Sequence, residues 1–177
     1  MSLRPGEPAP VLELVDTDGR PHTLPLPGEA PATVVVWTCN HCPYALAWHE
    51  RIQAVAREYG QRGIRVLQVN SNDAERYPRD SLEAMRARVA AGEFATPYLH
   101  DPEQSAARSY GALKTPDVFV LDANLRLAYR GAPDADHEDP DRNASWLRDA
   151  LDAVLAGARP DPAETEPVGC SVKWREP

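Results

Sequence analysis

Short apolar runs and amphipathic segments alternate along the chain in the order expected of an α/β protein. Residues 32–37 (ATVVVW) and 64–70 (IRVLQVN) are apolar and rich in β-branched side chains, which predicts two strands buried on both faces. Between them, apolar residues recur every three or four positions and predict an amphipathic helix that ends at Gly60. This stripe consists of Ala45, Trp48, Ile52, Val55 and Tyr59. Strand, helix and strand form a βαβ unit, whose right-handed crossover makes its two strands parallel.

The remaining patterns predict a mixed central sheet with helices on both faces. A second helix is expected to begin at Asp80, with Glu83 in position for a capping box. The other predicted elements are a hairpin of residues 11–16 and 21–26, a loop at 25–31, the second helix at 80–92, a strand at 96–100, a helix at 103–111, strands at 117–122 and 125–130, and a last helix at 144–156.

Length and composition fit one domain, because 177 residues with 42% hydrophobic side chains can bury a real core. A net charge of −8 argues against a general nucleic-acid binder, which needs clustered Lys and Arg. No signal peptide and no apolar run of membrane-spanning length is recognised, so we expect a cytoplasmic protein that does not enter the membrane. The acidic residues at 134–141 are expected to form a solvated loop.

The C-terminal residues differ in character from the rest of the chain. We expect a domain at 1–158 and a tail at 159–177. The tail is rich in Pro and Glu but contains the sequence VGCSVKW. The apolar residues Val168, Val172 and Trp174 in this sequence indicate that the tail docks on the domain.

Two cysteines, Cys39 and Cys42, lie three positions apart where a predicted strand gives way to a helix. A structural disulfide, a metal site and a redox couple all use such spacing. A reducing compartment argues against the first, and zinc normally needs four ligands. The chain has no second cysteine pair, and its other histidines stand singly at His22, His49, His100 and His137. A redox couple without metal or cofactor is therefore favoured.

The surroundings of the pair favour a reactive thiolate. Free backbone N–H groups and the positive end of the helix dipole stabilise negative charge on Cys39. A protonated His41 would add positive charge, stabilise the dithiol form and make the couple more oxidising. Pro43 lacks an N–H and suits the first turn of a helix. Farther along, the Thr115-Pro116 bond is a candidate for a cis peptide.

These motifs together resemble a known fold. A strand, WTCNHC, a helix and a strand, followed by KTPDVFVLD, a hairpin and a final helix, resemble the thioredoxin fold. The N-terminal hairpin and the inserted α/β segment at about 80–100 resemble the branch that holds the redoxins, alkyl hydroperoxide reductases and thiol-specific antioxidant proteins. CNHCPY with GCSVKW is similar to a bacterial subgroup of thioredoxin family proteins. The resemblance covers about residues 5–158 and the tail motif.

The resemblance implies a thiol–disulfide oxidoreductase that acts on a disulfide-containing protein or small thiol and is recycled by a thiol reductant. It implies that Cys39 attacks and Cys42 resolves. Pro116 would be the cis-proline that faces the pair, and Thr115 would offer its backbone to an extended substrate strand. Trp37 would flank the site.

The sequence also departs from the thioredoxin pattern. Asn40 and His41 replace the usual Gly-Pro between the cysteines, and we expect them to modulate the redox potential. The strand at 32–37 lacks the buried acid that assists proton transfer in thioredoxin, a role that His41 or an acid from elsewhere could fill. Cys170 is either a lone thiol in a docked tail or a third redox cysteine that reaches Cys39 or a second subunit.

Two other functions fit the same fold. Peroxidases of this branch place Pro and Thr upstream of the cysteine as PxxxTxxC, whereas here Thr38 is adjacent to Cys39 and no Pro stands at the required position. A peroxidase therefore ranks second. A non-enzymatic copper chaperone ranks third, because such relatives use a wider cysteine spacing and a distant histidine, for which His137 is the candidate.

Overall fold

The computed structural model describes residues 2–24, 28 and 30–177, and part of the predicted loop at 25–31 lies outside these residues. The strands are β1 (Leu12–Asp16), β2 (Pro21–Leu24), β3 (Ala32–Trp37), β4 (Arg65–Asn70), β5 (Tyr98–His100), β6 (Lys114–Thr115), β7 (Asp117–Asp122), β8 (Leu127–Gly131) and β9 (Cys170–Ser171). The helices are α1 (Pro43–Gly60), α2 (Leu82–Ala90), α3 (Ser105–Tyr110), α4 (Ser145–Leu155) and the 3-10 helix η1 (Pro78–Asp80).

Seven strands form one sheet in the order β2-β1-β5-β4-β3-β7-β8, and β6 and β9 form a separate pair. β3, β4 and β5 are parallel to their neighbours in this group, whereas the other strand pairs are antiparallel. This arrangement confirms the predicted mixed central sheet with an N-terminal hairpin. Among the described helices, none combines the length and the hydropathy needed to span a bilayer.

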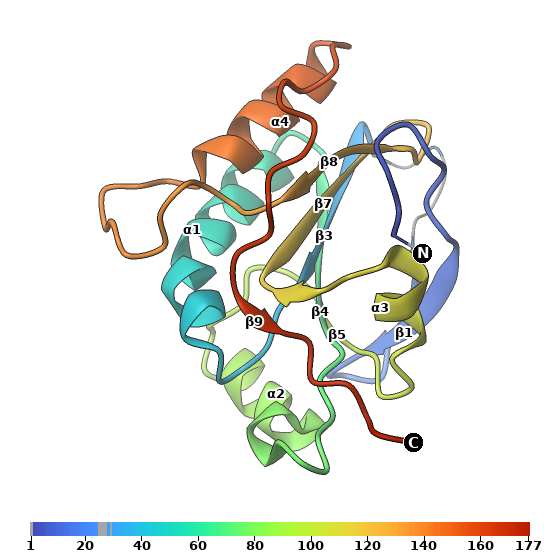
Figure 1. Cartoon of the computed structure of the whole chain (residues 1–177), viewed down its shortest axis with the longest axis vertical. Coiled ribbons are helices and arrows are strands. Elements are labelled where there is room, and N and C mark those ends of the chain that lie inside the picture. Colours follow the sequence, from blue (N-terminus) through green and yellow to red (C-terminus); the bar gives the residue numbers. More distant parts are fainter. Residues whose placement is uncertain (1, 25–27, 29) are drawn as a thin grey trace.

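The side chains of β3 alternate between two cores, one on each face of the sheet. Val34 and Val36 pack with α1 and α4, while Val35 and Trp37 pack with α3 and the N-terminal segment. Figure 1 shows α1 and α4 together on one side of the sheet and α3 on the other. Burial of each large apolar side chain contributes roughly 1.5–3 kcal/mol, so the two cores fix β3 at the centre of the fold.

The second helix begins later than predicted. Ser81 is its N-cap, and the Ser81 hydroxyl accepts the Ala84 N–H at 3.1 Å. The predicted capping box that begins at Asp80 is therefore wrong. Asp80 instead ends η1, and its side chain is fully buried.

The predicted strand at 125–130 also begins later, at Leu127. Leu125 adopts a left-handed conformation with φ of 61°. The Asp122 carboxylate accepts the N–H groups of Asn124 and Arg126 at 2.9 and 3.0 Å. These bonds extend the turn beyond the two residues of the predicted tight hairpin.

The acidic loop at 134–141 is anchored, which corrects the expectation of a wholly solvated segment. Asp134 is buried, and its carboxylate accepts the Trp48 Nε1–H at 2.8 Å and two bonds from Arg51 at 3.0 Å. The same carboxylate accepts the Ala144 N–H just before α4. One buried acid thus ties the loop to both helices on this face.

A second buried acid, Asp117, begins β7. Its carboxylate accepts the Leu113 N–H at 3.1 Å and contacts Arg130 Nη2 at 3.3 Å. Burial raises the pKa of Asp117 to about 6, although Arg130 and the backbone donors oppose this shift. The native state therefore holds a proton on Asp117 at pH values where the unfolded chain has lost it.

This shift predicts a pH-dependent stability. Because the folded pKa lies above the ordinary value of 3.8, the free energy of unfolding should fall by about 3 kcal/mol as the pH rises from about 3 to about 7. Urea unfolding of the wild type and Asp117→Asn over this range checks the slope, which the variant should largely lose. Asp149→Asn, at an exposed position, serves as the matched control. Equal slopes for the wild type and Asp117→Asn would contradict the assignment.

Candidate functional site

The site lies where β3 ends and β7 begins. The antiparallel register pairs Trp37 with Asp117. Cys39 follows Trp37 by two residues, and Thr115 precedes Asp117 by two, so the cysteine and the threonine meet at the same end of the two strands. The predicted cis peptide is confirmed between Thr115 and Pro116.

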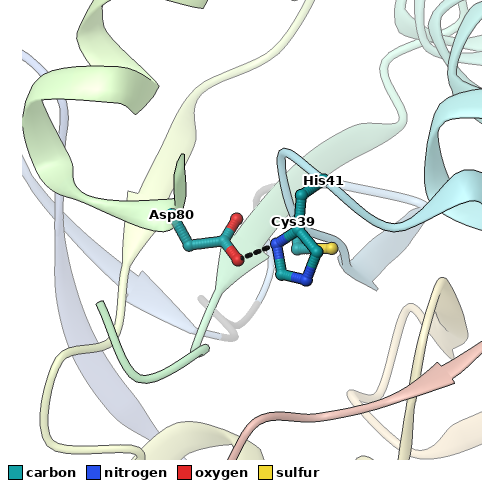
Figure 2. A group of neighbouring side chains, drawn as sticks. All are labelled: Cys39, His41 and Asp80. Carbon is teal, nitrogen blue, oxygen red and sulfur yellow. Dashed lines mark ion pairs between the residues drawn. The ribbon is translucent and has the colours of Figure 1, made fainter. Parts of the chain in front are cut away.

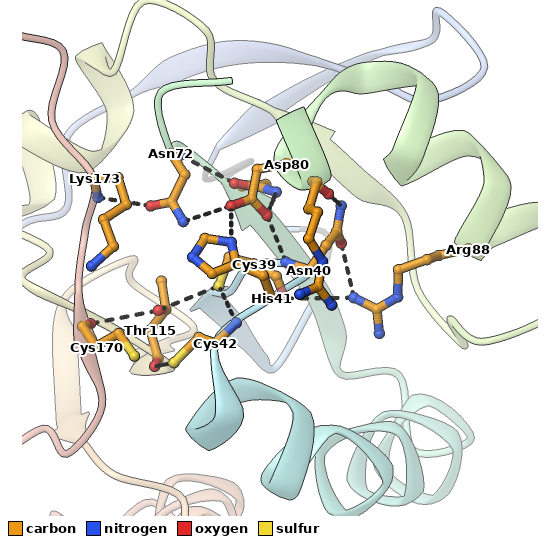
Figure 3. Close-up of polar contacts among 12 residues, drawn as sticks. Cys39, Asn40, His41, Cys42, Asn72, Asp80, Arg88, Thr115, Cys170 and Lys173 are labelled. Carbon is orange, nitrogen blue, oxygen red and sulfur yellow. Dashed lines mark hydrogen bonds and ion pairs between the residues drawn. The ribbon is translucent and has the colours of Figure 1, made fainter. Parts of the chain in front are cut away.

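The two thiols both contact Thr115. The Sγ of Cys39 lies 3.6 Å from the Thr115 hydroxyl, and the Sγ of Cys42 lies 3.1 Å from the Thr115 carbonyl oxygen. Cys42 is the N-cap of α1, and its backbone N–H points at the Cys39 sulfur at 3.3 Å. Both cysteines are free thiols, and Figure 3 shows them facing Thr115.

The close contact couples the titrations of the two thiols. The hydrogen bond between them raises the pKa of Cys39 and lowers the pKa of Cys42 to about 4. Burial and the negative charge of Asp80 raise the pKa of Cys39 further, whereas the Thr115 hydroxyl lowers the pKa of both thiols. The two sulfurs thus compete for one proton, and these shifts favour the thiolate on Cys42; transfer of the shared proton from Cys39 to Cys42 would leave the thiolate on Cys39.

The C-terminal tail covers the pair. Cys39 and Cys42 are 1% and 0% exposed. Cys170 is half-buried and packs against the cluster formed by Cys39, Cys42 and Ala45. Its strand, β9, pairs antiparallel with β6 so that Cys170 is opposite Thr115. Neither sulfur of the pair is open to solvent while the tail stays in this position.

Asp80 is the buried acid nearest to the cysteines. Its Oδ1 accepts the Asn40 N–H at 2.7 Å and the Asn70 side-chain N–H at 3.1 Å. Its Oδ2 accepts from the Asn72 side chain at 3.0 Å and lies 2.5 Å from Nδ1 of His41. The Asp80 carboxylate thus contacts both residues that lie between the cysteines, Asn40 and His41.

Asn40 and His41 are fixed by further contacts. The side-chain oxygen of Asn40 accepts from Arg88 at 2.8 Å and from the Tyr98 hydroxyl at 2.7 Å. The His41 ring stacks on Tyr77 with centroids 5.6 Å apart. The two inner residues of the motif are therefore ordered parts of the site.

The sequence prediction missed Asp80 as a site residue. The capping-box pattern assigned its side chain to a helix terminus, and only the fold shows that it reaches His41 (Figure 2) and Asn40 (Figure 3). The polar run after β4 gave one signal, because Asn70 and Asn72 lie where strand ends commonly meet a cleft. Trp37 does not lie beside the thiols as predicted. It packs with Tyr110 and Phe119 in the core on the α3 face of the sheet, whereas α1 packs on the other face.

Cys39, His41 and Asp80 carry side chains of the kinds that bind zinc, and their donor atoms lie within 4.8 Å of one another (Figure 2). A closed zinc site takes four ligands. Each oxygen of Asp80 already has two partners, which an ion would have to displace. The donor set therefore suits a hydrogen-bonded acid better than a metal site.

His137, the candidate histidine of the copper-chaperone alternative, packs against the rings of Tyr44 and Trp48.

The chain matches a family model and is similar to proteins of known sequence and structure. A model described as the AhpC/TSA family matches residues 5–130. A thiol:disulfide interchange protein DsbE from Allochromatium vinosum is 32% identical over 120 residues, which cover 66% of this chain and 60% of that protein. A hypothetical protein from Sinorhizobium meliloti has a crystal structure that matches with 35% identity and a TM-score of 0.92, covering 100% of this chain and 98% of that one.

A putative thioredoxin from Neisseria meningitidis shares the fold at 18% identity. Its solution structure matches with a TM-score of 0.65 and covers 84% of this chain and 89% of that one. Together with the strand order and the position of the cysteines, this likeness confirms the predicted thioredoxin fold.

Two substitutions should move the thiol titration in opposite directions. Thr115→Val removes a hydroxyl that lowers both thiol pKa values, so thiolate should form at higher pH. Asp80→Asn removes a charge that raises the pKa of Cys39, so thiolate should form at lower pH. Each shift should be about one pH unit. The measurement is the pH dependence of iodoacetamide alkylation, followed at each cysteine by mass spectrometry.

Urea unfolding supplies the control for these variants. Asp80→Asn should also lose roughly 1–3 kcal/mol of stability, because an amide cannot accept all the bonds made to the carboxylate. Alkylation is therefore measured on protein shown to be folded at each pH. A shift of both variants in the same direction would contradict the proposed electrostatic roles of Thr115 and Asp80.

Proposed function

Because the chain belongs to the AhpC/TSA family, we propose that Cys39 and Cys42 form a redox couple that exchanges thiols and disulfides with a substrate. One observation carries this proposal: the sulfurs of Cys39 and Cys42, which lie at the N-terminus of α1, both contact Thr115. The similarity to a thiol:disulfide interchange protein supports a thiol redox function.

The first step is attack by Cys39. Transfer of the shared proton to Cys42 leaves a thiolate on Cys39, which the Cys42 N–H stabilises at 3.3 Å. The protonated Cys42 can then donate to the Thr115 carbonyl at 3.1 Å. The thiolate attacks one sulfur of a substrate disulfide, a bond forms between Cys39 and that sulfur, and the other substrate sulfur leaves as a thiolate and takes up a proton.

The second step is resolution by Cys42. Its thiolate attacks the Cys39 sulfur of the mixed disulfide, the Cys39–Cys42 bond forms, and the second substrate sulfur is released. Two electrons pass from the dithiol to the substrate. The same steps in reverse oxidise a substrate dithiol, so the direction depends on the potential of the partner.

Asp80 and His41 tune this chemistry in opposite senses in our proposal, because the charge of Asp80 raises the pKa of Cys39 and a cationic imidazole would lower it. The carboxylate holds His41 close to the Cys39 sulfur, since the donor atoms of the three residues lie within 4.8 Å. A protonated imidazole beside the pair stabilises the thiolate form and makes the couple more oxidising. Asp80 supplies the buried acid that β3 lacks, from η1 instead of a strand.

The burial of both sulfurs restricts how a substrate can reach them. In our proposal a disulfide reaches Cys39 after β9 leaves β6, because Cys170 on β9 packs against the cluster that contains both cysteines. A small disulfide or an extended protein segment could then enter beside Thr115. We propose such a substrate and a separate thiol reductant as the partners, and the cytoplasm as the location.

Thiol mapping and substrate turnover test the redox couple. Mild oxidation of the wild type should give a Cys39–Cys42 disulfide, identified by peptide mass spectrometry, and the reduced protein should reduce a model disulfide such as insulin. Cys42→Ser should trap a mixed disulfide on Cys39, and Cys39→Ser should lose turnover. Wild-type protein that forms no Cys39–Cys42 bond and shows no turnover would rule out the proposal.

A peroxidase is the second candidate, because the matched family includes the alkyl hydroperoxide reductases after which it is named. Hydrogen peroxide in place of the disulfide distinguishes the two. Steady thiol-dependent turnover of peroxide, faster than disulfide reduction, would favour the peroxidase. The adjacency of Thr38 to Cys39 leads us to expect the opposite result.

His41 should set the potential of the couple. His41→Ala removes a group that favours the thiolate form, so the reduction potential should fall by about 30 mV, which corresponds to about 1.4 kcal/mol for two electrons. Equilibration with glutathione buffers, read out by mass spectrometry, measures this value. His22→Ala is the matched control, since His22 contacts Asp16 in the N-terminal hairpin. An unchanged or higher potential in His41→Ala would contradict the role of the imidazole.

A further inference from the structure

The C-terminal tail is built into the redox site through β9. Cys170 is paired with Thr115 and Ser171 with Lys114 in an antiparallel ladder. The Val172 N–H continues the contact by donating to the Leu113 carbonyl at 3.1 Å. These backbone bonds hold the side chain of Cys170 at a defined position beside the cysteine pair.

Two further contacts keep the tail in register. The Lys173 N–H donates to the Asn72 side chain at 2.8 Å, and the Lys173 carbonyl accepts the Asp73 N–H at 2.8 Å. Asn72 also donates to Asp80, so the tail is joined to the network that holds His41. The tail is therefore bound both to β6, through β9, and to the Asp80 network, through Asn72.

Gly169 permits the close approach of the tail to Thr115. A Cβ at this position would lie 2.2 Å from the Thr115 carbonyl oxygen, which is far inside van der Waals contact. The same oxygen lies 3.1 Å from the Cys42 sulfur. Only glycine brings the tail close enough to place Cys170 against Cys42.

The sulfurs of Cys42 and Cys170 meet beside Thr115. Cys170 packs on the cluster formed by Cys39, Cys42 and Ala45. Figure 3 shows the two sulfur atoms next to the Thr115 carbonyl, with the Cys39 sulfur near the hydroxyl of the same residue. Cys42 therefore lies between two cysteines: its N–H donates to the Cys39 sulfur at 3.3 Å, and its own sulfur is next to that of Cys170 in Figure 3.

We propose that Cys170 is a third redox thiol, which accepts the disulfide from Cys39–Cys42 by attacking Cys42. This inference rests on the proposed redox couple and extends it. The Cys170 thiolate attacks the Cys42 sulfur, a Cys42–Cys170 bond forms, and the Cys39–Cys42 bond breaks. Cys39 leaves as a thiolate and takes up the proton that Cys170 gave up. No net oxidation occurs, because one disulfide replaces another.

The exchange has a structural consequence. The new bond would link β9 to α1 while it frees the nucleophile Cys39. The tail would then be held over the pair covalently until a reductant cleaves Cys42–Cys170. A reduced tail, held only by hydrogen bonds and packing, would be free to leave and admit a substrate.

Cys39→Ser isolates the proposed bond. In this variant, oxidised glutathione should produce an intramolecular Cys42–Cys170 disulfide, identified by peptide mass spectrometry, at a rate independent of protein concentration. Cys42→Ser is the matched control and should form no Cys39–Cys170 bond under the same conditions. Stable glutathione adducts or intermolecular dimers alone in Cys39→Ser would overturn the proposal, as would equally fast bond formation in both variants.

Two further substitutions, both in the Cys39→Ser background, test the geometry without removing another cysteine. Gly169→Ala should slow formation of Cys42–Cys170 by about tenfold, because the added methyl group forces β9 away from Thr115. Ser171→Ala, at an exposed position of the same strand, should leave the rate within about twofold. Equal rates for the Gly169 and Ser171 variants would overturn the role of strand docking in the exchange.

Wild-type protein separates this inference from the proposed function. After equilibration with glutathione and acid quenching, peptide mapping should show both Cys39–Cys42 and Cys42–Cys170 disulfides. If the wild type turns over substrate but neither the wild type nor Cys39→Ser forms a Cys42–Cys170 bond, only the role of Cys170 is overturned. A wild type that has no Cys39–Cys42 bond and no turnover would instead overturn the redox couple itself.

Discussion

The pairing of β3 with β7 is the constraint on which the site depends. Its register places Trp37 opposite Asp117, and the chain beyond each of these residues then brings Cys39 to Thr115. A shift of one residue would reverse the side chains of β3 between the two cores. The packing of Val36 on one face and Trp37 on the other therefore fixes the position of Cys39.

Thr115 converts this backbone geometry into chemistry. Its carbonyl contacts Cys42, and its hydroxyl contacts Cys39 and lies 3.5 Å from the Cys170 carbonyl. One residue thus touches all three cysteines of the chain. Because the same residue contacts both the tail and the cysteine pair, displacement of β9 would change the surroundings of the thiols.

The sequence predicted the parts of the molecule that local patterns control. The apolar run of β3, the stripe of α1 and the order of strands followed from periodicity, and the cysteine spacing with Thr115-Pro116 indicated the site. Asp80 could not be found in this way. A local pattern offered it a capping role, and Ser81 fills that role at the start of α2. Its real partners come from β4 and the loop before α1, a contact that only tertiary structure creates.

Asp80 gives the site a buried acid although β3 carries none. A carboxylate on that strand would lie among apolar side chains and carry a large cost of desolvation. Asp80 lies instead at the end of η1, where Asn40, Asn70 and Asn72 donate hydrogen bonds to its oxygens. These donors offset the cost of burying the charge and aim it at His41. The acid therefore lies on the loop side of the site, next to Cys39, in contact with both residues between the cysteines.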